Sequence, residues 1–185
     1  LIIIGIGTEK SKDFFCRFNK IDSQNVFALP DDDLHKKLKL NSGFLSPLPP
    51  IINLLIMCVG INSRGTINEV LRGYLGDKNA KFIFSSEEDI KIGPLPIFKG
   101  KIFDTFSKTL ILRPFELATR RLINMIEILS NWNTYVPDAS FLTQRGATFL
   151  LKENDEVLYK FISESLLGYS CKMSEPLSFL DDFLN

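Results

Sequence analysis

The chain opens with Leu1-Ile2-Ile3-Ile4-Gly5-Ile6-Gly7-Thr8-Glu9-Lys10, the pattern of a buried strand that runs into a helix. A run of aliphatic residues this apolar is typical of a strand covered on both faces, and such a strand is normally central in a parallel sheet. It needs neighbours, so we expect at least one further strand to precede Leu1. The numbered sequence is then expected to be a fragment or mature remnant, and its upstream piece becomes a candidate for holding the chemistry.

The same alternation continues on both sides of this stretch. Thr8 can cap a helix that extends to Phe18, and Val26–Leu29 is predicted to form a second strand, parallel to the first because βαβ crossovers are right-handed. A helix is expected from Asp31 to Leu40, with acidic residues at its start and lysines near its end. Near the other end of the chain, the pattern predicts an antiparallel hairpin and a short amphipathic helix, at Gly146–Phe161 and Pro176–Leu184.

The middle of the chain, residues 42–137, breaks this alternation and is interpreted as a large, mainly helical insertion. Thr66-Ile67-Asn68-Glu69 fits a capping box, and Pro114 is expected in the first turn of a helix that reaches Leu129. Lys78–Lys108 contains several Gly and Pro residues and is expected to be exposed loop, with brief extended pieces around Phe82-Ile83-Phe84. With 185 residues, the length favours one domain over residues 1–185.

Composition excludes several classes of function. Lys+Arg and Asp+Glu are each 22, so no net field attracts polyanions and a nucleic-acid partner is not expected. The three cysteines are widely spaced and accompanied by one histidine, His35, which is expected to be solvated, so neither a metal site nor a disulfide framework is predicted. Gly5-Ile6-Gly7 lacks the third glycine of a dinucleotide-binding turn, and no cofactor is expected.

The order of elements, once a leading β-α unit is restored, is that of a thioredoxin fold, and particular strings point to one family. These strings are Leu1–Gly7 with Thr8-Glu9-Lys10, Ala28-Leu29-Pro30-Asp31 leading to Leu34–Leu40, and Gly146-Ala147-Thr148-Phe149 followed by Glu156-Val157-Leu158-Tyr159. They resemble the AhpC/TSA peroxiredoxin-like proteins, specifically the peroxiredoxin-like 2 group. Gly73–Asp77, Arg113–Ala118 and Pro176–Leu180 are similar to the long form of cyanobacteria and plastid-bearing eukaryotes. The resemblance implies a thioredoxin-like three-layer α/β/α fold and a plastid location, in the stroma or on the thylakoid surface, with the cytoplasm as the alternative.

The family's redox cysteines sit at the start of the first thioredoxin helix, which the resemblance places before Leu1. No catalytic residue is therefore assigned within the chain. Cys171, in a loop beside Lys172, and Cys16, close to Arg17, are the remaining redox candidates because a reactive thiolate needs exposure and a cationic neighbour. Cys58 lies in an apolar run and is expected to be inert.

Two further groups of residues are candidate contact sites. Ile51–Ile61 is very apolar but well short of the roughly 20 residues needed to span a bilayer. Its Leu54, Leu55, Met57 and Val59 either pack inside the chain or dock on a partner. Arg113, Arg120 and Arg121 could bind an anion or a partner's carboxylates, or could form an ordinary surface network with nearby acidic residues.

Two functions remain open at this point. The first is a non-catalytic binding or accessory subunit, with a protein partner or a plastid membrane complex and no transmembrane span of its own. The second is a thiol-dependent antioxidant peroxidase or reductase whose active cysteine lies upstream of Leu1. The upstream sequence would discriminate between them, because a cysteine there favours the enzyme.

Overall fold

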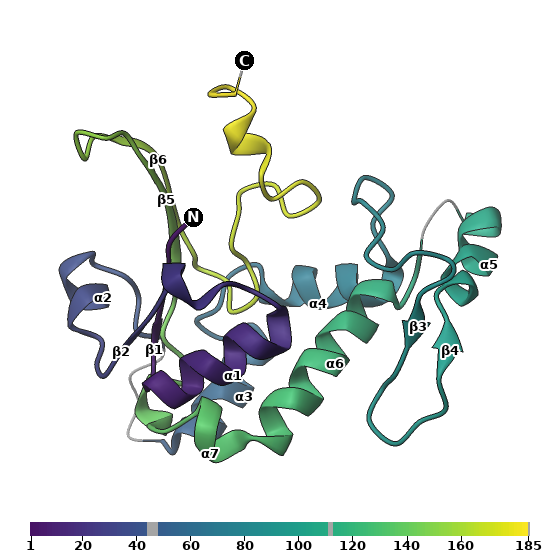
Figure 1. Ribbon diagram of the computed structural model, residues 1–185, viewed down its shortest axis with the longest axis horizontal. Coiled ribbons are helices and arrows are strands. Elements are labelled where there is room, and N and C mark those ends of the chain that lie inside the picture. Colours follow the sequence, from purple (N-terminus) through teal and green to yellow (C-terminus); the bar gives the residue numbers. More distant parts are fainter. Residues whose placement is uncertain (44–47, 111–112, 185) are drawn as a thin grey trace.

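The computed structural model of the chain describes residues 1–43, 48–110 and 113–184 (Figure 1). Strand β1 (Ile3–Ile6) pairs in parallel with β2 (Val26–Leu29), with Ile3 opposite Val26 and Ile6 opposite Leu29. Helix α1 (Glu9–Asn19) connects the two strands. The predicted parallel pair and its connecting helix are confirmed.

The expectation that the first strand is covered on both faces is wrong for the described residues. Leu1, Ile2 and Ile4 are exposed, although the sequence around them is continuously apolar. Strand β1 has only β2 as a neighbour in its sheet, so helix packing reaches one side of the pair and leaves the other open. An apolar run therefore indicated the strand correctly but not its burial.

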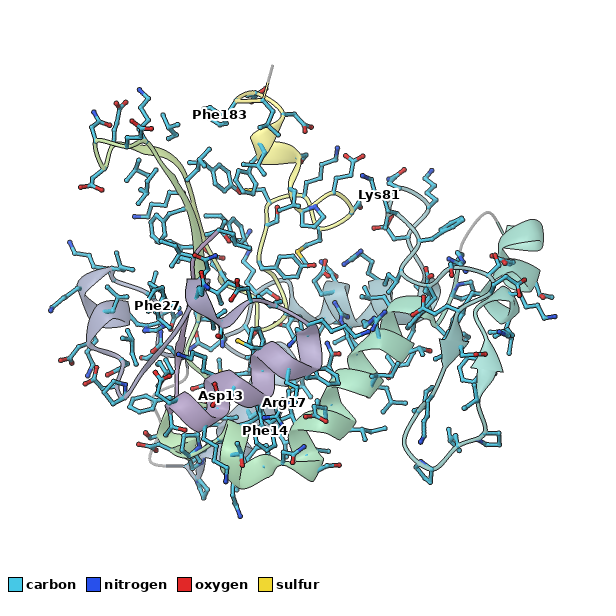
Figure 2. All side chains as sticks on the ribbon, viewed as in Figure 1. Asp13, Phe14, Arg17, Phe27, Lys81 and Phe183 are labelled. Atoms are coloured by element: carbon cyan, nitrogen blue, oxygen red, sulfur yellow. The ribbon has the colours of Figure 1, made fainter. Side chains whose placement is uncertain are left out.

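Helix α1 begins at Thr8 through a capping box. The Thr8 hydroxyl accepts a hydrogen bond from the Ser11 amide, and the Ser11 side chain reaches back to the Thr8 amide. Ser11 Oγ also donates to the Thr134 carbonyl over 2.7 Å, which ties α1 to α7 (Trp132–Tyr135). Phe14, which is labelled on α1 in Figure 2, meets the Tyr135 ring edge-on at 6.2 Å. The cap and the aromatic contact together fix α1 beside α7.

The hairpin prediction is confirmed, whereas the two shorter helices differ from expectation. Strands β5 (Ala147–Leu151) and β6 (Val157–Ile162) pair antiparallel. Helix α2 (Asp33–Lys37) stops short of Leu40, since Lys39 adopts a positive φ of 56° that ends the helix. The C-terminal segment forms only a 3₁₀ turn at Ser178–Leu180 instead of an amphipathic helix.

The middle of the chain is mainly helical. It contains α3 (Pro50–Cys58), α4 (Thr66–Leu75), α5 (Lys101–Leu110) and α6 (Glu116–Ser130), the last of which runs diagonally across the molecule (Figure 1). The capping box predicted at Thr66 is wrong: Gly65 occupies the N-cap position with a φ of 83°, and Thr66 Oγ1 instead accepts a bond from the Leu166 amide. The side chain expected to cap α4 thus holds the loop after β6.

The expectation of exposed loop holds for much of residues 78–97 but not for the apolar side chains that form the main buried cluster, nor for the helix that begins at Lys101. Strands β3 (Asp89–Ile90) and β4 (Phe98–Lys99) form a short antiparallel pair before α5. Phe84, Ile90, Ile92 and Phe103 are buried together, and the Phe84 and Phe103 rings stack at 5.8 Å. Ile123 and Ile126 of α6 pack against this cluster, so α6 turns that side inward.

The described residues form three separate two-stranded sheets, in place of the single sheet of the predicted three-layer α/β/α arrangement. The hairpin is joined to the first part of the chain by loop contacts, such as the Arg145 amide donating to the Asn41 carbonyl over 2.8 Å. The interval 42–137 includes residues 44–47 and 111–112, which lie outside the described residues. Its status as an insertion stays a prediction.

Candidate functional site

A cleft of about 420 Å³ opens where β1 and β2 end. It is bounded by Gly7 and Thr8 after β1, Pro30 after β2, and Gly146 before β5. The carboxyl ends of parallel strands meet at one edge of a sheet, and this edge is where α/β folds usually bind ligands. We call this space the sheet-edge cleft.

Arg145 is the most buried charged residue of the sheet-edge cleft. Its guanidinium donates to the carbonyls of Thr143 (2.9 Å), Asn62 (3.3 Å) and Glu164 (3.3 Å). Burial lowers the pKa of Arg145. The pKa of an arginine is nevertheless so far above neutral pH that the side chain stays charged. This side chain therefore joins three loops through their carbonyls and places a positive charge behind the cleft.

His35 also lines the cleft, which sequence reasoning missed. Its ring is half-buried rather than solvated, and its Nδ1 has no hydrogen-bond partner among the described residues. Burial lowers the pKa of His35, and the nearby Asp32 carboxylate opposes this only in part. The imidazole is therefore neutral at pH 7. Its position just after the carboxyl end of a predicted parallel strand was the signal that could have found it.

The three cysteines occupy different environments. Cys16 is buried in α1. Cys58 is exposed at the last residue of α3, where desolvation raises the pKa of its thiol despite the charge of Arg145. Cys171 is exposed, and the Tyr159 hydroxyl donates to its Sγ over 3.7 Å. Because reactivity requires an accessible thiolate, Cys171 is better placed than Cys16, the other redox candidate.

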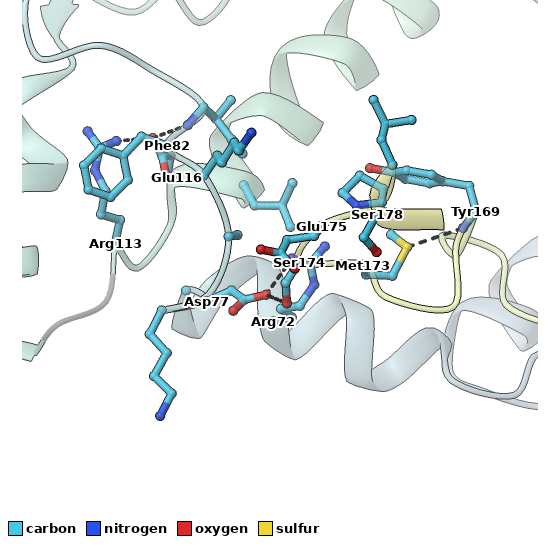
Figure 3. A pocket seen from close by; sticks show the side chains of 18 of the residues that line it. Arg72, Asp77, Phe82, Arg113, Glu116, Tyr169, Met173, Ser174, Glu175 and Ser178 are labelled. Carbon is cyan, nitrogen blue, oxygen red and sulfur yellow. Dashed lines mark hydrogen bonds and ion pairs between the residues drawn. The ribbon is translucent and has the colours of Figure 1, made fainter. Parts of the chain in front are cut away.

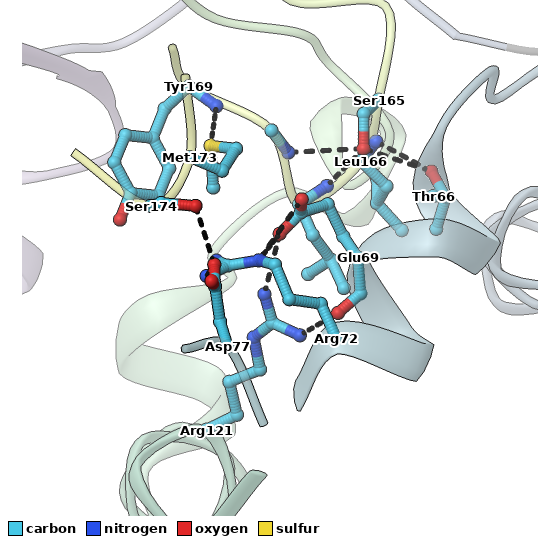
Figure 4. Close-up of polar contacts among 12 residues, drawn as sticks. Thr66, Glu69, Arg72, Asp77, Arg121, Ser165, Leu166, Tyr169, Met173 and Ser174 are labelled. Atoms are coloured by element: carbon cyan, nitrogen blue, oxygen red, sulfur yellow. Dashed lines mark hydrogen bonds and ion pairs between the residues drawn. The ribbon is translucent and has the colours of Figure 1, made fainter. Parts of the chain in front are cut away.

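The three candidate arginines reach separate partners and do not form one anion site. Arg113 is buried and bonds to the Glu116 carboxylate at 2.6 Å. Arg121 donates to the Glu69 carbonyl (2.7 Å) in a network with Arg72 (Figure 4). Arg120 lies over the Phe84 ring at 4.4 Å. Each arginine has an acidic partner: Arg113 pairs with Glu116 in the interior, Arg121 with Glu69 at 3.3 Å, and Arg120 with Glu88 at 3.9 Å on the surface.

The docking candidates on α3 divide by burial. Leu55 and Val59 are 60% and 62% exposed, Leu54 is half-buried, and Met57 is fully buried at 0%. Met57 therefore cannot contribute to an exposed surface, because the α3 face that carries it turns inward. The exposed stripe adjoins that of α4 where the Ile67 side chain approaches Gly60. We define the α3–α4 surface by its exposed members: Ile51, Leu55, Val59, Ile61, Ile67, Leu71, Tyr74 and Leu75.

Within residues 1–43, 48–110 and 113–184, no three His, Cys, Asp or Glu side chains gather in a way that could hold a metal ion. No helix in the part of the chain that the structure describes combines the length and apolar character needed to cross a membrane.

Comparison with known proteins identifies the family. The model of the family described as AhpC/TSA antioxidant enzyme matches residues 1–165, which is most of the chain. No curated protein and no solved structure matches. The chain therefore belongs to the AhpC/TSA family, whose members have a thioredoxin-like α/β fold.

Proposed function

We propose that this member of the AhpC/TSA family acts, in the region described, as a binding module that docks on a protein partner through the α3–α4 surface. The observation that carries the proposal is the row of large apolar side chains exposed along two neighbouring helices. Large contiguous apolar patches that are exposed on a folded domain usually mark interaction sites.

The charges around this surface favour a protein over a lipid bilayer as the occupant. Helices that lie on membranes carry Lys and Arg on their polar face, which contact anionic headgroups. Helix α3, Pro-Ile-Ile-Asn-Leu-Leu-Ile-Met-Cys, has no charged residue, and the Arg72 guanidinium of α4 bonds to Glu69 and Asp77. Protein interfaces have apolar centres depleted of charge, which fits this composition.

The placement of the thiols supports a binding role over catalysis for this region. Cys16 is shielded, and Cys58 lies at a helix C-terminus, where the helix dipole disfavours a thiolate. A raised thiol pKa lowers the thiolate fraction at neutral pH. Both effects reduce the nucleophilicity that peroxide reduction requires.

The docking proposal is tested with the Leu55→Glu/Val59→Glu double variant. We expect the native chain to migrate within a larger complex on size-exclusion chromatography of its native extract, and the double variant to elute as the free protein. Leu95→Glu/Ile97→Glu is the matched control, since it alters two equally exposed apolar residues elsewhere. A photo-crosslinker at position 55 then identifies the partner for reconstitution with purified protein.

The docking claim fails under two results. One is a double variant that unfolds, with an altered thermal melt, while the native chain is a monomer, because the segment would then be core. The other is that the native chain sediments with vesicles, and not in a protein complex, and that the double variant is released from them. The surface would then be a membrane contact.

A second candidate function is thiol-dependent peroxide reduction, which the family match favours. Within the described residues the thiol best placed for it is Cys171, whose Sγ is exposed beside the Tyr159 hydroxyl. In that reaction the thiolate attacks one peroxide oxygen, the O–O bond breaks, the sulfur becomes a sulfenate, and the other oxygen leaves as alcohol or water after taking a proton. Peroxide turnover with a thioredoxin system that is lost in Cys171→Ser and kept in Cys16→Ser would favour this candidate. The subgroup, the plastid location and an active cysteine upstream of Leu1 stay predictions.

A further inference from the structure

A cavity of about 470 Å³ lies between the loop after α4, the start of α6 and the segment that follows β6 (Figure 3). We call it the C-terminal pocket. Residues 166–184, which we call the strap, supply one side of it through Met173, Ser174 and Leu177. We propose that the strap opens and closes as a unit over the C-terminal pocket, with a fixed end at Leu166 and a latch at Ser174.

The strap is held by few buried contacts along its length. Ser170 is the one buried residue among residues 166–184, whereas Tyr169 and Leu177 are 58% and 65% exposed. The regular structure of the strap is a single 3₁₀ turn, Ser178–Leu180, and the backbone hydrogen bonds of residues 172–184 join positions three or four apart. A segment with low burial and only local backbone bonds opens at a free energy well below that of global unfolding.

The fixed end of the strap is built on buried hydroxyl groups. The Leu166 amide donates to Ser63 Oγ at 3.1 Å and to Thr66 Oγ1 at 2.9 Å, as Figure 4 shows for Thr66 at the start of α4. Ser63 is 1% exposed and Thr66 is 0% exposed. Moving Leu166 away would cost its amide two buried acceptors, so the strap moves about this residue and not together with it.

The latch is a side-chain bond to an acceptor that other residues already hold in position. Ser174 Oγ donates to the Asp77 carboxylate over 2.6 Å (Figure 3). The same carboxylate accepts from Arg72 Nη1 at 3.1 Å and from the Asn79 amide at 2.9 Å, and neither donor belongs to the strap. Asp77 therefore keeps its place and its charge partner when Ser174 leaves, and the strap can close on it again.

A ring contact positions the later part of the strap against the hairpin. The Phe179 ring stacks on the Tyr159 ring of β6, with centroids 4.2 Å apart and planes at 8°. One stacked ring pair and one hydrogen bond each contribute far less than the stability of a whole domain. They can therefore break together while the helices and strands beneath the strap stay folded.

Opening of the strap removes one side of the C-terminal pocket and leaves the other in place. Ile83 and Leu117 line the pocket from outside the strap. The Ile83 amide is held by the Glu116 carboxylate at 2.9 Å, and Glu116 is itself paired with Arg113. The pocket thus has a fixed side and a movable side, and the strap controls access to it.

Hydrogen exchange on the whole isolated chain, measured by mass spectrometry of its peptides, tests the proposal. We expect residues 167–184 to exchange through openings that low urea concentrations barely accelerate, whereas α4 and α6 exchange through strongly urea-dependent unfolding. Ser174→Ala should raise the exchange rate of residues 167–184 about tenfold, because a hydrogen bond to a charged acceptor is lost, and should leave α4 unchanged. Ser178→Ala is the matched control, since it removes from the same strap a hydroxyl without a hydrogen-bond partner among the described residues.

Trypsin gives a second measurement of the same opening. Lys172 in the strap and Lys152 in the hairpin turn are 61% and 50% exposed, and each is paired with a nearby glutamate. Ser174→Ala should speed cleavage after Lys172 about tenfold and leave cleavage after Lys152 unchanged, because cleavage follows the population of the open form.

Three results would each overturn the proposal. The strap could exchange only with global unfolding, its amides could be unprotected in the native chain, or the rates of Ser174→Ala and Ser178→Ala could agree. All of these measurements use the isolated chain, so none of them depends on whether the α3–α4 surface docks on a partner.

Discussion

Replacing Glu116 by Ala should destabilise the protein more than any surface substitution, because Glu116 is the buried partner of three donors. Its carboxylate accepts from Arg113 Nη1 at 2.6 Å and from the amides of Ile83 and Phe84 at 2.9 Å. Both ends of the ion pair are buried. The substitution therefore leaves a buried cation and two backbone N–H groups without their acceptor.

The expected loss in the free energy of unfolding depends on the partners that Arg113 keeps after the substitution. Removing one partner of a buried ion pair costs about 3–5 kcal/mol. Arg113 keeps the Asp104 carboxylate at 3.2 Å and the Phe84 carbonyl at 3.0 Å, which places Glu116→Ala at the lower end, about 3 kcal/mol. That is a large part of the roughly 5–15 kcal/mol by which a domain is stable. For a chain of this size it corresponds to a fall in Tm of about 6–12 °C.

Urea unfolding followed by the fluorescence of Trp132, the single tryptophan, measures this loss. Glu156→Ala is the matched control: its ion pair with Lys152, at 2.9 Å, joins side chains 50% and 54% exposed and is worth about 0–1 kcal/mol. The double variant Arg113→Met/Glu116→Leu should lose less than Glu116→Ala, because it removes the unpaired charge. The reasoning is refuted if Glu116→Ala costs no more than Glu156→Ala.

Two further predictions concern α1 and the sheet-edge cleft. Thr8→Ala removes the acceptor of the Ser11 amide and should lower stability by about 1 kcal/mol, measured in the same urea titration; an unchanged midpoint would show that Ser11 and its bond to Thr134 hold the helix start alone. His35 has a lower pKa in the folded chain than the ordinary 6.5, so the unfolded chain takes up its proton first and this contribution to stability is lost as pH falls below 6.5. Urea midpoints at pH 7.5 and 5.5 should therefore differ more for the native chain than for His35→Gln, and equal differences would contradict the burial of the imidazole.

The parts of the fold that could be predicted are those whose signal is local. The start of α1 depends on Thr8 and Ser11, three residues apart, and the parallel pairing of β1 with β2 follows from a strand, a helix and a strand in immediate succession. The hairpin of β5 and β6 is likewise set by two apolar runs and the polar turn between them. In each case the residues that decide the structure lie within one or two elements.

Residues 78–108 show why the remainder was not predictable. Gly and Pro residues there indicate irregular backbone, which is correct for most of residues 78–97 outside β3, yet Phe84, Ile90 and Phe103 form the buried cluster. What orders them is the pair Arg113 and Glu116, about 30 residues away along the chain, through bonds to the Phe84 amide and carbonyl. No periodicity within the loop carries that information, because the contacts are long-range and between a side chain and the backbone.

The candidate sites likewise differ in whether the sequence close to each residue indicates its surroundings in the fold. His35 was identifiable only by its place in the helix that follows a parallel strand, since the lysines around it indicate solvent. The polar neighbours of Cys171 did indicate that its thiol is exposed, whereas its rank as a redox candidate stays a prediction.

Helix α3 illustrates the limit of an apolar run most directly. A helix that is apolar all round is normally buried, and its sequence does not say which side faces the protein. The structure divides it sharply, with Met57 fully buried and Leu55 60% exposed two residues earlier. Packing inside the chain accounts for the side that carries Met57, and it leaves the apolar character of Leu55 and Val59 without a role in the described fold. The docking proposal assigns that role to a partner with an apolar face of its own, and this is why the docking test alters the exposed pair and leaves Met57 in place.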